Sequence, residues 1–268
     1  MTPRNFLVRG LLAGLIAGIL TFAVAYIAGE PSIDAAIQVE SAGEATSHSH
    51  DHDAAHSHEE GAAKHSHDEE GGTVVSRQNQ STWGLLTATV PTGVALGGIV
   101  ALASAFALGR IGRLRPSQST ALVAALGFVS VALVPFIKYP ATPPAVGDAD
   151  TIGARTTQYF VMLAISVVAM IAVVLLFRAL LERLGAYTAV LISAATYLAV
   201  VILAGELMPT VNEIGDFPAD TLWYFRRGSL MTLATLWGVL GIALTGLIGK
   251  LYAQESATQA RRDLAASL

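Results

Sequence analysis

Six apolar stretches, each close to the length that a helix needs to cross a bilayer, constrain this chain more than any other feature. They run from about Phe6 to Ala28, Leu85 to Leu108, Ser119 to Ile137, Tyr159 to Phe177, Tyr187 to Leu207 and Ser229 to Gly249. A helix spans the hydrocarbon core with about 20 apolar residues. Because lipid offers no partner to backbone polar groups, each stretch is expected to be helical. The sequence therefore predicts an all-α integral membrane protein with six transmembrane helices.

Composition agrees with this class and excludes several functions. Of the 268 residues, 53% are hydrophobic and 13% are charged, whereas a soluble domain usually has about 25% charged residues. The absence of cysteine excludes disulfides, cysteine-ligated metals and thiol catalysis. The net charge of −4 argues against nucleic acid as a partner. No nucleophile–base set is visible, so we expect neither an enzyme nor an organic cofactor.

Charged residues predict the orientation. If the N-terminus is cytoplasmic and six spans alternate, the inside segments hold ten of the 16 basic residues and three of the 20 acidic ones. The outside segments then hold six basic and 17 acidic residues. Since basic residues favour the cytoplasmic side, we expect both termini to be cytoplasmic and the chain to form three helical hairpins that open outward. The first span, residues 1–29, is longer than the about 7–15 apolar residues of a signal peptide, so it is expected to remain as an anchor.

The outside segments are longer than the inside ones and are expected to carry the function. The first covers residues 30–84. The second and third, 138–158 and 208–228, belong to a five-span bundle over 85–249, which a cytoplasmic tail, 250–268, follows. Small residues recur every four positions in the first and second spans, beginning at Gly10 and Gly93. This spacing permits close helix contact within the bundle, with a contact between subunits as the alternative.

A histidine-rich tract over residues 47–70 is the strongest functional signal. It holds every histidine of the chain, interleaved with Asp and Glu, and it lacks bulky apolar residues, so it is predicted to be disordered. Imidazole and carboxylate together suit divalent cobalt, nickel, zinc and copper. A solvated acidic linker with incidental histidines is the alternative. The predicted metal ligands are His48, His50, His52, His56, His58, His65 and His67.

The other two outside loops resemble each other. Gly147-Asp148 followed by Asp150-Thr151 parallels Gly215-Asp216 followed by Asp220-Thr221. This similarity indicates two hairpins of one parallel repeat, whose loops would face each other. Carboxylates gathered there would raise one another's pKa until a divalent ion binds.

Nine oxygen-bearing residues of the outside segments are therefore candidates for the transport path. Capping of helix N-termini is the alternative role for the aspartates, and we favour it for Asp150 and Asp220. Glu30 and Asp34 would share one face of a short amphipathic helix. The full set is Glu30, Asp34, Asp148, Asp150, Glu206, Asn212, Glu213, Asp216 and Asp220.

Several of these motifs together resemble the CbtA family of predicted cobalt transporter subunits. The shared features are Glu30-Pro31 with Ile33-Asp34, the histidine tract, the run from Lys138-Tyr139-Pro140 to Gly147-Asp148, and Asn212-Glu213 with Phe217-Pro218-Ala219-Asp220. The resemblance implies cobalt uptake for cobalamin synthesis. It also implies a small partner subunit with a single span, similar to CbtB, and about five spans. We keep six, because only an even number gives the charge alternation.

The sequence as a whole predicts a subunit for uptake of divalent cobalt, with nickel as the alternative ion, in the plasma membrane of a prokaryote. The histidine tract would collect the ion and pass it to carboxylates at the outer mouth. A metal-binding accessory subunit that does not itself transport, and a divalent-metal exporter, are the two alternatives.

Overall fold

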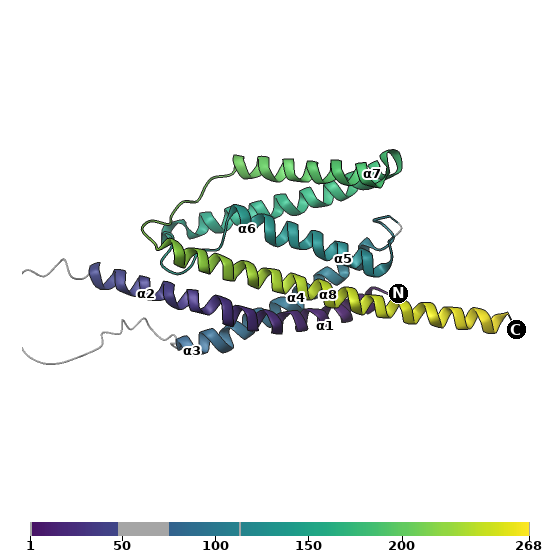
Figure 1. Ribbon diagram of the computed structural model, residues 1–268, viewed down its shortest axis with the longest axis horizontal. Helices are drawn as coiled ribbons and strands as arrows, with labels where there is room; N and C mark the ends of the chain where they lie inside the picture. Colours follow the sequence, from purple (N-terminus) through teal and green to yellow (C-terminus); the bar gives the residue numbers. More distant parts are fainter. Residues whose placement is uncertain (1, 48–74, 113, 268) are drawn as a thin grey trace, which may run out of the picture.

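The computed structural model describes residues 2–47, 75–112 and 114–267, and within these ranges it contains helices and no strand. All seven histidines lie outside the described residues, so metal binding by the tract stays a prediction. The long helices run nearly parallel, and the start of α1 (Pro3–Val24) and the end of α8 (Ala219–Ala266) lie at the same end of the bundle (Figure 1).

Five helices in the described part of the chain are long and apolar enough to cross a membrane. The first joins α1, a π-helical segment η1 (Ala25–Gly29) and α2 (Glu30–Ser47). The predicted helix after the first span is therefore present, but it continues that span without a break and extends beyond Glu40.

The next two long helices are also interrupted by π-helical turns rather than by loops. The second comprises α3 (Arg77–Asn79), η3 (Gln80–Gly84) and α4 (Leu85–Ala107). The third comprises α5 (Pro116–Gly127), η4 (Phe128–Leu133) and α6 (Val134–Lys138). Both agree with the predicted apolar stretches. The second long helix begins before its stretch, and the third extends past its stretch at both ends.

The fourth and fifth predicted stretches form one element. After a 3-10 turn, η5 (Ala149–Thr151), α7 runs over Ile152–Leu207 for 56 residues. A straight helix of that length would measure about 84 Å, far more than the about 30 Å of a bilayer core. However, Gly185 has φ 77° and ψ 165°, which glycine adopts without the cost that a Cβ would add. The sequence stretches therefore correspond to five long helices, with one non-helical glycine inside the fourth.

The two arms of α7 on either side of Gly185 lie side by side (Figure 1). The hydroxyl groups of Ser166 and Tyr197 are 2.8 Å apart, and Met170 and Val201 belong to the same buried cluster. The chain thus turns back on itself at Gly185.

The glycines of α1 and α4 let these two helices pack backbone against backbone. A Cβ at Gly14 would overlap the carbonyl group of Gly93, and a Cβ at Gly97 would overlap that of Gly10. The small-residue stripes therefore pack within the bundle, as predicted. α8 completes the core beside them with Leu240, Leu244 and Ile248, all fully buried.

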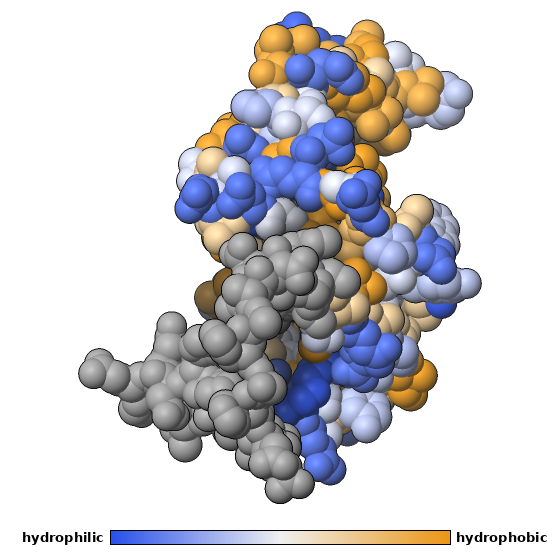
Figure 2. All heavy atoms as spheres, turned by 90° about the vertical axis from the view of Figure 1, so that its left-hand side faces the viewer, coloured by the Kyte–Doolittle hydropathy of each residue, from blue (hydrophilic) through white to orange (hydrophobic). Residues whose placement is uncertain are grey.

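Hydrophobic side chains also cover the outside of the bundle. Ile99, Phe106 and Ile242 are each at least 65% exposed, as expected for helix faces that contact lipid. By contrast, the end of the bundle that carries the loop before η5 and the loop before α8 shows hydrophilic residues across its middle (Figure 2). The candidate transport residues of those two loops belong to this polar end.

Candidate functional site

The two related outer loops lie against each other, as their sequence similarity predicted. The Tyr139 hydroxyl donates a hydrogen bond to the carbonyl oxygen of Pro209 over 2.8 Å. The Lys138 ammonium donates to the carbonyl oxygen of Met208 over 3.3 Å. These contacts join the end of α6 to the end of α7.

Glu213 is the centre of this contact. Its Oε2 accepts hydrogen bonds from the backbone amide of Asp148 at 3.1 Å and from the Thr151 hydroxyl at 2.8 Å. Arg155 Nε lies 3.4 Å from the same oxygen. The Asp148 amide, the Thr151 hydroxyl and the Arg155 charge together hold the pKa of Glu213 below its ordinary value. The expectation of a raised pKa is therefore wrong for Glu213, because two hydrogen-bond donors and the Arg155 cation outweigh the opposing effect of the nearby Asp148 carboxylate.

Gly147 makes room for the arginine of this contact. Its φ of +100° favours glycine, and a Cβ there would overlap the guanidinium group of Arg155. Arg155 Nη2 also donates to the carbonyl oxygen of Asp148 over 3.0 Å. Asp148 in turn caps η5, since its Oδ1 accepts from the backbone amide of Asp150 at 2.9 Å. The capping role that we favoured for Asp150 therefore belongs to Asp148.

A wide cavity of about 890 Å³ opens beside Glu213. We call it the acidic vestibule, because Glu40, Asp148, Glu213 and Asp216 line it and, among the described residues, no basic side chain does. Asn212 is also part of its wall. Glu40 lies on α2, eight residues before His48, so the vestibule adjoins the helix that leads into the histidine tract. Sequence analysis missed Glu40, because its place opposite the two loops depends on how far α2 extends.

The vestibule is not a preformed metal centre. Within the described ranges, no group of three or more histidine, aspartate or glutamate side chains is arranged to hold a metal ion. The donor set consists of carboxylate and amide oxygens, which suit divalent cations in a loosely held, hydrated state. The arrangement can attract cations and release them again.

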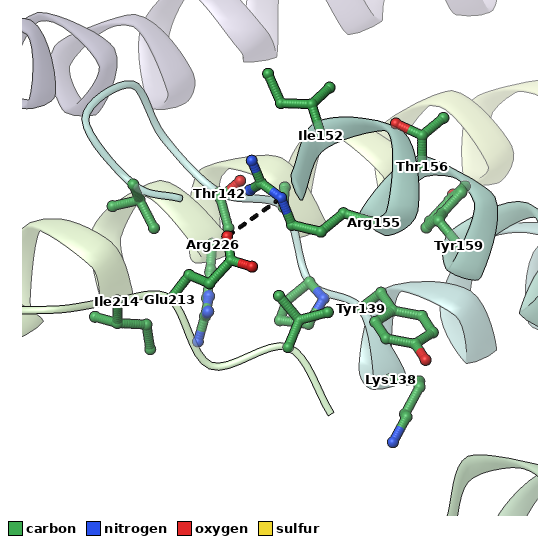
Figure 3. Close-up of a pocket in the computed structure, with 14 residues that line it drawn as sticks. Lys138, Tyr139, Thr142, Ile152, Arg155, Thr156, Tyr159, Glu213, Ile214 and Arg226 are labelled. Atoms are coloured by element: carbon green, nitrogen blue, oxygen red, sulfur yellow. Dashed lines mark ion pairs between the residues drawn. The ribbon is translucent and has the colours of Figure 1, made fainter. Parts of the chain in front are cut away.

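A second cavity, of about 430 Å³, is also lined by Glu213 (Figure 3). We call it the basic pocket, because Lys138, Arg155 and Arg226 line it and Glu213 is its single carboxylate. Figure 3 shows Arg155 and Glu213 joined by an ion pair, with Tyr139 and Tyr159 toward the other side of the pocket. Glu213 thus lines two cavities whose other charged lining residues have opposite signs.

Glu30 and Asp34 share a helix face, as predicted, and both bind Arg77. The Arg77 guanidinium forms an ion pair with the Glu30 carboxylate and donates from Nε to Asp34 Oδ1 over 3.0 Å. These contacts connect α2 with α3, the two helices that flank residues 48–74. Both carboxylates are therefore paired, although the single charge of Arg77 leaves one negative charge in excess. Neither residue lines the acidic vestibule.

The remaining three candidates also lie outside the lining of the vestibule. Asp150 and Asp220 are exposed; Asp220 Oδ1 accepts from the backbone amide of Thr221 over 2.8 Å. Pro218 holds the N-cap position of α8, and Asp220 lies in the first turn of the helix. Asp220 is therefore not the cap that we expected. Glu206, also exposed, makes no hydrogen bond or ion pair with any described residue.

Comparison with known proteins gives one match. A family model described as "Probable cobalt transporter subunit (CbtA)" matches residues 3–249, which is most of the chain and includes both cavities. No curated protein and no solved structure matches the chain.

Proposed function

Because the chain belongs to the CbtA family of probable cobalt transporter subunits, we propose that it carries divalent cobalt inward across the plasma membrane of a prokaryote. The observation that supports this most is the acidic vestibule. Four carboxylates line it; Glu213 is paired with Arg155, whereas Glu40, Asp148 and Asp216 form no ion pair with a described residue. Glu40 lies on the helix that leads to the histidine tract. The tract would collect cobalt, with nickel as a second ion, and the vestibule would receive it.

Weak, reversible ligation is what such a transfer requires. Histidine and carboxylate ligands in a tract exchange divalent ions readily when no fixed geometry traps one of them. The vestibule raises the local cation concentration without a rigid ligand set, so an ion that arrives can leave. For an inward-moving divalent cation, a potential of 100 mV contributes about 4.6 kcal/mol.

We further propose six spans with both termini in the cytoplasm. The turn at Gly185 would make each arm of α7 one span, and the start of α1 lies at the same end as the end of α8 (Figure 1). Since the chain has no cysteine, single cysteines at Ser66 and Ser256 test this directly. An impermeant thiol reagent should label the first in intact cells and the second only after lysis. Labelling of both in intact cells would exclude the six-span arrangement.

Cobalt flux with the purified protein tests the function itself. Liposomes that contain the chain alone should accumulate cobalt when the inside is negative, and empty liposomes should not. If flux requires a second, single-span subunit similar to CbtB, co-reconstitution should restore it. Outward movement in whole cells would instead identify an exporter.

An accessory role without transport is the second candidate function. Apart from Glu30, which is paired with Arg77, the buried polar residues of the described helices carry hydroxyl groups, as do Ser104 and Ser166. A cation path through a bilayer usually contains ionisable groups. Absence of cobalt flux both alone and with the partner would favour this role.

A further inference from the structure

The basic pocket carries more positive charge than the described residues balance. Arg155 is paired with Glu213. Arg226 makes no hydrogen bond or ion pair with any described residue, and its Nε is buried without a partner. Lys138 donates only to the carbonyl oxygen of Met208, and its Nζ lies 5.6 Å from the centre of the Tyr139 ring. Two cations at one cavity are therefore left without a counter-charge.

We propose that the basic pocket binds a phosphate group, either that of a lipid head group or free phosphate. Leaving a cation partly buried and unpaired costs free energy, and an anion placed between Lys138 and Arg226 would remove that cost. Arginine binds phosphate well, because its planar guanidinium group presents several N–H donors to the oxygens. This site goes beyond cobalt transport and does not depend on it.

Other lining residues suit the same ligand. Thr142 and Thr156 also line the pocket, and their hydroxyl groups form no hydrogen bond with any described residue, so they are free to donate to phosphate oxygens. Ile152, Val146 and Val211 add an apolar wall. At about 430 Å³ the pocket falls within the usual size of small-molecule sites, roughly 300–1,000 Å³. It can therefore accommodate the glycerol part of a lipid head group as well as its phosphate.

The pocket is a poor route for cobalt. Three basic side chains against one carboxylate would repel a divalent cation. The vestibule, which Glu213 also lines, has the opposite charge. Anion and cation would thus bind in two separate cavities that share the Glu213 side chain.

Arg226 and Arg227 provide a matched pair for the test. Arg226 lines the basic pocket, whereas the exposed Arg227 lies outside it, with its guanidinium carbon 4.8 Å from the centre of the Tyr224 ring. Two probes are used with the purified full chain. The first probe is inorganic phosphate, whose binding is measured by calorimetric titration. The second is lipid: the protein is placed in nanodiscs containing phosphatidylglycerol or phosphatidylcholine, extracted from them, and assayed for the lipid that stays bound.

Wild type and Arg227→Gln are expected to bind at least one probe equally, whereas Arg226→Gln should weaken binding at least tenfold. Lys138→Gln should weaken it further in the double variant, and Arg226→Lys should restore part of it. Binding of inorganic phosphate identifies a soluble anion, and retention of phosphatidylglycerol alone identifies a lipid. Equal binding by Arg226→Gln and Arg227→Gln, or no binding of either probe by the folded wild type, would overturn the proposal.

Discussion

Removing two charges from the acidic vestibule, Glu40→Gln together with Asp216→Asn, should lower the initial rate of cobalt uptake at least tenfold when cobalt is scarce. Both side chains are exposed and neither makes a hydrogen bond or an ion pair with a described residue. Their substitution should therefore leave the fold intact. Electrostatic attraction by a cleft of one charge can raise association rates by about 10- to 1,000-fold.

The ionic-strength dependence distinguishes attraction from ligation. Because the Debye length falls to about 3 Å at 1 M salt, the difference between wild type and the double variant should shrink as salt is added. Asp220→Asn is the matched control, since Asp220 is an exposed carboxylate of the same loop region but does not line the vestibule. Flux would be measured per folded molecule in liposomes. An unchanged rate in the double variant would remove the vestibule from the path and favour the accessory role.

Glu213 is expected to behave differently from these two residues. It receives two hydrogen bonds and an ion pair that connect the third outer loop to the start of α7. Glu213→Gln should therefore loosen the contact between the loops. For this reason Glu213 is a less specific probe of the cation path than Asp216.

The sequence predicted the helices well because apolar length is a strong signal in a membrane chain. It also predicted that the two outer loops meet, from their shared Gly-Asp and Asp-Thr pairs. It could not show that Gly185 alone would interrupt α7, since the backbone conformation of one glycine leaves no periodic pattern. Here the apolar stretches on either side, not the glycine, indicated two helices.

The roles of individual carboxylates were harder to predict. The sequence predicts nine candidate residues in the outside segments, but it does not show which of them are held by hydrogen bonds and ion pairs. Arg77 forms ion pairs with both Glu30 and Asp34, and Arg155 forms one with Glu213. The partners of Glu30 and Asp34 come from more than 40 residues away, and those of Glu213 from about 60. No local spacing rule connects positions so far apart, so their pairing became visible only in the folded chain.

Replacing all seven histidines of the tract with asparagine should reduce cobalt uptake about tenfold at scarce metal and leave it unchanged at saturating metal. Ligands attached to the chain near the vestibule raise the effective concentration of the ion there to the millimolar range, roughly, and this advantage disappears once the external concentration is high. Asparagine keeps the length and the carboxylates of the tract, so only imidazole ligation is lost.

A shuffled tract with the same residues is the matched control, and it should transport normally, because an irregular collector needs composition and not order. Both variants retain Arg77 and its contacts with Glu30 and Asp34, which join the helices on either side of the tract. Loss of uptake at every cobalt concentration would show that the histidines form the transport site itself. Equal uptake by the asparagine variant at scarce metal would identify the tract as a linker. If uptake is reduced only when cobalt is scarce, the tract collects the metal in a step that precedes passage through the bundle and is separate from it.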